Sequence, residues 1–148
     1  MKRWLVIVVA AGVLLPAVVA IALLARGSEE QQLTRMEPLQ FPDFVYRSAK
    51  TQMGYQLAVE NQGLFPRMPC YCGCGAMADN PHRNLLDCFI NADGSYDPHA
   101  SGCDVCVDIA VDAVRWRQEG KTTAEVRSLV DAKYQAYGRP TGTAPVGE

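Results

Sequence analysis

The chain has 148 residues, enough for one small domain beside an N-terminal segment, and its formal net charge at pH 7 is −2. Three of its 14 Lys and Arg residues and none of its 16 acidic residues precede Gly27, which leaves the remainder acidic, at about −5. An acidic chain without a basic patch argues against nucleic acid as a partner.

The N-terminus carries an apolar run from Trp4 to Ala25 that contains no charged residue and follows Lys2 and Arg3. At about 1.5 Å per residue a helix of this length spans roughly 33 Å, close to the hydrocarbon core of a bilayer. The basic flank predicts a cytoplasmic N-terminus and an extracytoplasmic remainder. We therefore expect residues 1–26 to be a single-pass anchor in the cell membrane, or an uncleaved signal. A secretory signal cleaved near Ala20 stays open as the alternative.

The segment after the apolar run divides into a linker and a domain. Residues 27–41 are polar, contain Pro38 and show no clean periodicity, which is typical of a linker. A cysteine-rich domain is expected over residues 42–138. It begins with a helix from about Arg47 to Gln62. The tail, residues 139–148, is expected to be disordered.

The clearest helical pattern lies in the C-terminal half. Apolar residues recur at helical spacing from Cys103 to Gln118, and Gly120 ends this helix. Thr122 and Glu125 form a capping box that begins a second helix, expected to reach about Tyr137. The fold class we predict is therefore mainly α: an N-terminal transmembrane helix followed by a small cysteine-rich helical domain that ends in a helical hairpin.

Three acidic residues, Asp104, Asp108 and Asp112, share one face of the first of these helices. Such a stripe could bind a cation. We expect an ordinary solvated helix face, because acidic side chains are favourable near a helix N-terminus.

Three cysteines occupy alternate positions in the sequence Pro-Cys-Tyr-Cys-Gly-Cys-Gly, at Cys70, Cys72 and Cys74. A disulfide across one intervening residue is strained, since its two Cα atoms need a separation of about 4.4–6.8 Å with converging side chains. In an extended segment, alternate side chains point to the same face. The spacing therefore predicts either a sulfur claw for a soft metal ion or three thiols that reach distant partners.

The remaining donor residues lie close by in the sequence. They are Cys88, Cys103, Cys106, His82 and His99, and outside residues 70–106 the chain has neither Cys nor His. Cys103 and Cys106 begin a helix, where the partial positive charge of the N-terminus favours thiolate. This segregation indicates one site or one framework that includes all six cysteines.

Three interpretations remain open. In the first, the eight residues Cys70, Cys72, Cys74, Cys88, Cys103, Cys106, His82 and His99 bind a soft metal, with copper(I) preferred to zinc. In the second, each cysteine of the first group forms a structural disulfide with one of the second group, and no metal is bound. In the third, the Cys103/Cys106 pair exchanges disulfides with a partner, although no βαβ pattern surrounds it.

These motifs resemble those of the bacterial PCYCGC-motif proteins and lipoproteins. The resemblance rests on Pro69 to Gly75, His82, Leu86 to Phe89, His99 to Cys106 and Glu119 to Thr122, and it covers about residues 65–137. It implies an exported, membrane-attached protein. Because no lipid-attachment cysteine follows the apolar run, attachment would depend on the N-terminal helix.

The function we expect is metal storage or delivery by a membrane-anchored extracytoplasmic protein. We do not expect an enzyme, since no nucleophile elbow, zinc-protease helix or phosphate loop is present in the sequence. The expected partners are the membrane and an exported metalloprotein or metal transporter.

Overall fold

The computed structural model describes residues 39–77, 79 and 81–146, and in this part of the chain it is mainly helical. Three α-helices, α2 (Ala49–Glu60), α3 (Asp104–Gln118) and α4 (Thr123–Tyr134), are joined by segments that contain five short 3-10 turns. These turns are η1 (Asp43–Arg47), η2 (Phe65–Arg67), η3 (Cys74–Ala76), η4 (Leu86–Cys88) and η5 (His99–Gly102). The mainly α prediction is confirmed for the described residues.

The expected anchor and all but the last three residues of the expected linker lie outside the described residues. From residue 39 onward, where the structure is described, no helix is both long and apolar enough to cross a membrane. The N-terminal transmembrane helix therefore stays a prediction.

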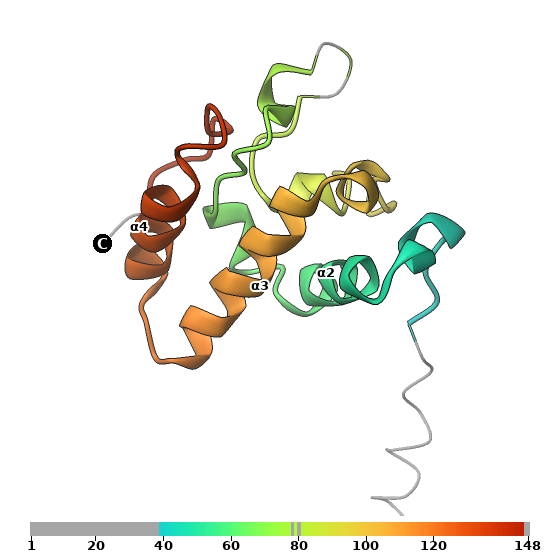
Figure 1. The fold of residues 1–148 in the computed structure, drawn as a ribbon, viewed down its shortest axis with the longest axis horizontal. Helices are drawn as coiled ribbons and strands as arrows, with labels where there is room; N and C mark the ends of the chain where they lie inside the picture. Colours follow the sequence, from blue (N-terminus) through green and yellow to red (C-terminus); the bar gives the residue numbers. More distant parts are fainter. Residues whose placement is uncertain (1–38, 78, 80, 147–148) are drawn as a thin grey trace, which may run out of the picture. The chain divides into compact units, whose positions relative to one another are not determined.

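Helix α3 is the central element, because both α2 and α4 pack against it (Figure 1). Ser48 caps α2 by accepting a hydrogen bond from the Thr51 amide at 3.0 Å. The predicted capping box of Thr122 and Glu125 is present at the start of α4. Gly120, at φ 87°, turns the chain between α3 and α4, so these helices form the predicted hairpin.

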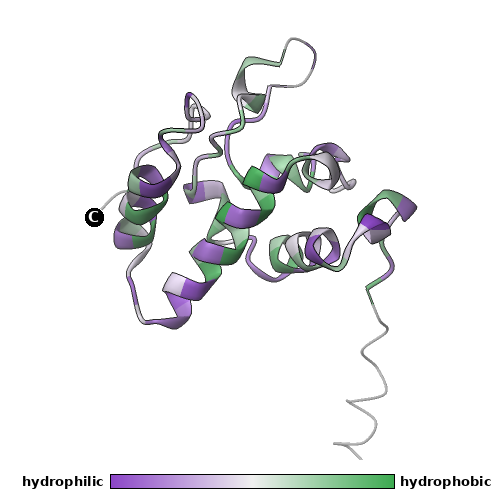
Figure 2. Ribbon diagram, in the orientation of Figure 1, coloured by the Kyte–Doolittle hydropathy of each residue, from purple (hydrophilic) through white to green (hydrophobic). Residues whose placement is uncertain are grey.

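The core lies between these helices and the segments that connect them. Hydrophobic and hydrophilic residues alternate along α3 and α4, as expected for helices with one buried face (Figure 2). Tyr55 of α2 packs edge-on against Phe89, with ring centroids 5.2 Å apart, and both side chains are fully buried. Cys70, Cys88 and Cys106 belong to the same core, so the thiols replace apolar side chains in it.

The three carboxylates of the α3 stripe form ion pairs with lysine side chains of the protein. Lys50 forms ion pairs with Asp104 and Asp108 at 3.3 and 2.8 Å. Asp112 is largely buried and accepts hydrogen bonds from the Lys133 ammonium and the Tyr134 hydroxyl. Asp104 and Asp108 therefore lie on a solvated helix face, as expected, whereas Asp112 joins α3 to α4.

Residues 139–146, which belong to the expected tail, run back along the cysteine loop. Thr141 is 4% exposed, its amide donates to the Cys70 carbonyl at 2.9 Å, and its hydroxyl accepts from the Cys70 amide at 3.0 Å. Thr143 donates to the Arg83 carbonyl at 2.8 Å. Both backbone groups of the first cysteine are therefore satisfied by a segment that composition alone marks as disordered.

We expect Asp112→Asn to lower the free energy of unfolding by about 1–3 kcal/mol, because the amide leaves the buried Tyr134 hydroxyl and the half-exposed Lys133 ammonium of α4 without a charged acceptor. Urea unfolding followed by circular dichroism measures the change. The matched control is Asp108→Asn, which removes a half-exposed ion pair and should cost less than about 1 kcal/mol. Equal losses in the two variants would contradict the assignment of Asp112 as the link between α3 and α4.

Candidate metal centre

The four other residues of the Pro-Cys-Tyr-Cys-Gly-Cys-Gly motif hold the cysteine loop in place. Pro69 is fully buried, and the Tyr71 hydroxyl donates a hydrogen bond of 2.7 Å to Asp131 of α4. Gly73 adopts φ 85°, a conformation that side chains disfavour. A Cβ on Gly75 would lie 3.2 Å from the Thr141 Cα, so only glycine fits comfortably against the tail. The structure therefore gives a reason for the residue type at each of these four positions.

The three sulfurs of the loop converge, although not in the way that an extended segment would produce. The Sγ atoms of Cys70 and Cys72 lie 3.3 Å apart. After Cys72 the chain turns at Gly73 and enters η3, which begins at Cys74. The turn brings the third sulfur within 4.8 Å of the other two, because strand-like alternation is replaced by a change of chain direction.

The second group of cysteines meets the first in the protein interior. The Cys74 and Cys88 sulfurs are 3.6 Å apart, and the Cys106 sulfur lies 3.4 Å from that of Cys70 and 3.6 Å from that of Cys72. All six cysteines are free thiols, so the three-disulfide framework is not present in the structure. A disulfide needs about 2.05 Å, whereas two thiolates on one tetrahedral zinc are about 3.8 Å apart, given a Zn–S bond near 2.3 Å. The observed separations are thus closer to those of co-ligands.

The donor atoms form three overlapping sets of four, and within each set all atoms lie within 4.8 Å of one another. The first set contains only cysteines, the second joins α3 to His99, and the third includes both histidines. Their members are Cys70, Cys72, Cys74 and Cys88; Cys72, His99, Cys103 and Cys106; and Cys74, His82, Cys88 and His99. The structure therefore brings together all eight residues singled out from the sequence, and whether they bind metal stays a prediction.

His82 is the most informative member, because its buried ring lacks hydrogen-bond partners. The residue is 2% exposed, and neither Nδ1 nor Nε2 forms a hydrogen bond within the described chain. Buried polar atoms without partners are rare in folded proteins and call for an explanation such as an ion. The ring stands edge-on to His99, with centroids 4.9 Å apart, and its Nε2 lies 3.6 Å from the carboxylate of Asp97.

Asp97 lies beside both histidines, although no sequence motif singled it out. It is 8% exposed, and its Oδ1 accepts a hydrogen bond of 2.8 Å from the His99 amide. A carboxylate beside a histidine orients the ring and raises its basicity in many metal sites. Only its position two residues before His99 could have indicated it. Its proximity to His82 depends on contacts between distant segments.

The electrostatics single out Cys72. Its Sγ accepts hydrogen bonds from the Cys70 and Cys106 thiols and lies 3.2 Å from His99 Nε2. Hydrogen bonds from Cys103, Cys106 and Cys70 hold the pKa of Cys72 far below the usual value for a thiol. Hydrogen bonds with Cys103 and Cys72 raise the pKa of His99 to about 10. In the metal-free protein these shifts favour a Cys72 thiolate beside a His99 imidazolium.

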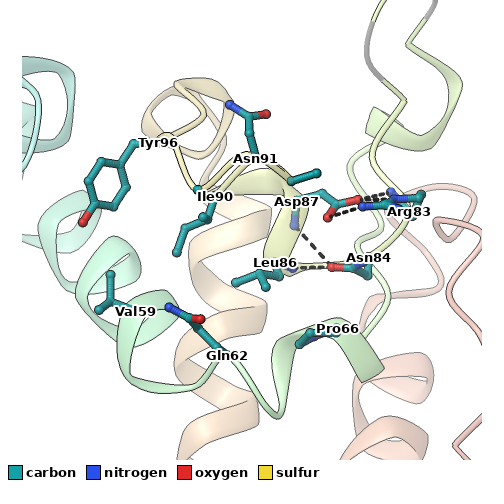
Figure 3. Close-up of a pocket in the computed structure, with 12 residues that line it drawn as sticks. Val59, Gln62, Pro66, Arg83, Asn84, Leu86, Asp87, Ile90, Asn91 and Tyr96 are labelled. Carbon is teal, nitrogen blue, oxygen red and sulfur yellow. Dashed lines mark hydrogen bonds and ion pairs between the residues drawn. The ribbon is translucent and has the colours of Figure 1, made fainter.

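A separate surface cavity of about 450 Å³ lies near η4 (Figure 3). Leu86, Ile90 and Val59 line it, and Arg83 and Asp87 pair with each other at its edge at 3.0 Å. It lacks a thiol or an imidazole, so it is unsuited to a soft metal. The candidate functional site is the sulfur and imidazole cluster.

We expect Cys72 to be the first cysteine alkylated by iodoacetamide in the metal-free protein at about pH 6, where an ordinary thiol is mostly protonated. Because the lowered pKa keeps Cys72 ionised at that pH, the rate at which Cys72 is alkylated should depend little on pH between about 6 and 8. Peptide mass spectrometry after short labelling identifies the site, and Cys103, which is also partly exposed, serves as the internal comparison. Faster labelling of Cys103 at the lower pH would contradict the assignment.

Comparison with known proteins agrees with the motif. A family model described as "Protein of unknown function with PCYCGC motif" matches residues 24–146, which include the whole donor cluster. Comparisons with curated proteins and with solved structures gave no significant match. The match confirms the resemblance seen in the sequence and extends over most of the chain: this protein belongs to the PCYCGC-motif family.

Proposed function

We propose that this chain is a membrane-anchored extracytoplasmic protein that binds Cu(I) through its cysteine cluster and stores it or delivers it. The observation that carries the proposal is the convergence of six free thiols and two imidazoles in one partly buried volume, with His82 left without hydrogen-bond partners inside it. The recipient would be an exported metalloprotein or a metal transporter.

The donor chemistry supports a soft ion. Thiolates select Cu(I), zinc and iron–sulfur clusters, whereas carboxylates and carbonyls suit Mg²⁺ and Ca²⁺. The cluster consists of sulfur and imidazole, and the acidic residues of α3 form ion pairs elsewhere. Hard cations are therefore poor candidates for this site.

The number of sulfurs favours copper over zinc. One structural zinc takes four ligands, but the cluster offers eight donors in sets that share Cys72, Cys74, Cys88 and His99. A thiolate can bridge two ions through its additional lone pairs, so overlapping cysteine sets suit a cluster of Cu(I). Zinc bound by a single set is the second candidate, since the sulfur separations are close to the edges of a tetrahedral site.

The proposed extracytoplasmic location fits the same function. Thiols outside the cytoplasm tend to be oxidised unless they are protected, and bound Cu(I) would protect them. A binding protein fits this donor arrangement better than an enzyme does, because four of the six cysteines are buried.

The test is anaerobic purification of the full chain in detergent with a reductant, followed by Cu(I) titration, elemental analysis and a thiol count under denaturing conditions. We expect at least two copper ions per chain, because the first and second donor sets share only Cys72. We also expect six free thiols once the copper has been removed. Zinc titration in parallel separates the two metals, since zinc should occupy fewer sites.

Three intact disulfides with no bound metal would contradict the proposal and favour the structural framework. A mixed disulfide with a partner protein that requires Cys103 or Cys106 would instead favour thiol–disulfide exchange. The matched control for metal binding is Met53→Leu, which removes an exposed sulfur of α2, outside the segment 70–106 that supplies the donors, and should leave copper binding unchanged.

A further inference from the structure

Building on the proposed function, we propose that copper enters and leaves through the donor set Cys72, His99, Cys103 and Cys106, which we call the outer set. From there it passes, by way of Cys72, to a second and more buried set. This second set, which we call the inner set, consists of Cys70, Cys72, Cys74 and Cys88.

Burial separates the two sets. Cys70, Cys74 and Cys88 are each at most 1% exposed, so the inner set has no direct access to solvent except through Cys72. In the outer set three of four members are partly exposed, and Cys106 alone is fully buried. A ligand arriving from solution therefore meets the outer set first.

The surface beside the outer set offers little steric obstruction. Cys72 precedes Gly73, and Cys103 follows Gly102, and both glycines are exposed. Apart from its chain neighbours, a Cβ placed on either glycine would meet no atom within 4 Å, so the surface is open at both glycines. An incoming thiolate that carries Cu(I) therefore meets two partly exposed cysteines, each next to a glycine that has no side chain.

Cys72 is the only residue that the outer and inner sets share. Its sulfur lies 3.3 Å from that of Cys70 on the inner side and 3.6 Å from that of Cys106 on the outer side. A bridging thiolate at this position can hold an ion of either set, so an ion moves inward by exchanging its other ligands while it stays bound to Cys72.

The ligand types give the direction of filling. The inner set supplies four thiolates, whereas the outer set supplies three thiolates and one imidazole. Because Cu(I) prefers the softer donor, the inner set should fill first and the outer set should hold the more exchangeable ion.

The transfer involves no change of oxidation state. Copper remains Cu(I) throughout. Each protein thiol that becomes a ligand gives up its proton, and the thiolate that leaves the donor takes up a proton.

The first experiment measures loading of the full chain in detergent from Cu(I)–glutathione, followed by the ultraviolet absorbance of copper–thiolate bonds. Cys103 belongs only to the outer set and Cys70 only to the inner set, so they form a matched pair. We expect Cys103→Ala to bind fewer ions and to slow loading by about tenfold, the scale on which single groups near a metal act. Cys70→Ala should also bind fewer ions but should load its outer ion at the wild-type rate.

The second experiment uses the unmodified protein, so it does not depend on whether a variant folds. After one equivalent of Cu(I), Cys103 should still react with iodoacetamide, and after full loading it should be protected. Protection of Cys103 by the first equivalent, or equal loading rates for wild type and Cys103→Ala, would overturn the two-set order. If the unmodified protein binds no copper, it is the proposed function itself that fails.

Discussion

Three thiols separated by single residues can surround one ion only if the backbone between them turns, and the geometry of this site depends on that turn. Gly73 supplies it with a positive φ, after which Cys74 begins a short 3-10 turn. Two sets of hydrogen bonds fix the loop: the Tyr71 hydroxyl donates to Asp131 of α4, and the backbone of Cys70 is hydrogen-bonded to Thr141. The C-terminal hairpin and tail therefore position sulfurs that lie far from them in sequence.

The cluster belongs to the hydrophobic core as well as to the site. Neutral thiols behave as small apolar side chains, and Cys88 and Cys106 are buried in the same core as Phe89 and Ile109. Several of these thiols resist ionisation: hydrogen bonding with neighbouring thiols and burial raise the pKa of Cys88. A cation that replaces their protons would compensate the charge that the interior otherwise disfavours. Metal binding should consequently release protons and stiffen the domain.

Much of this arrangement follows from local patterns in the sequence. The α3–α4 hairpin was predictable from apolar spacing, Gly120 and the Thr122 capping box. The donor residues were predictable from their confinement to residues 70–106. The burial of His82 and Asp97 was not, because it arises from contacts between segments distant in sequence. The contact of the tail with the cysteine loop was not predictable either, since composition does not reveal that one threonine is hydrogen-bonded to Cys70.

The proposed function requires that the sulfurs of both cysteine groups act together as ligands of one copper-binding centre. X-ray absorption spectroscopy at the copper edge of the reduced, copper-loaded full chain tests this most directly. We expect a Cu(I) edge and a first shell dominated by sulfur, with a smaller nitrogen contribution that disappears when both His82 and His99 are replaced by alanine. A first shell of nitrogen and oxygen, or a copper content and sulfur shell that stay unchanged after Cys88, Cys103 and Cys106 are all replaced, would contradict it.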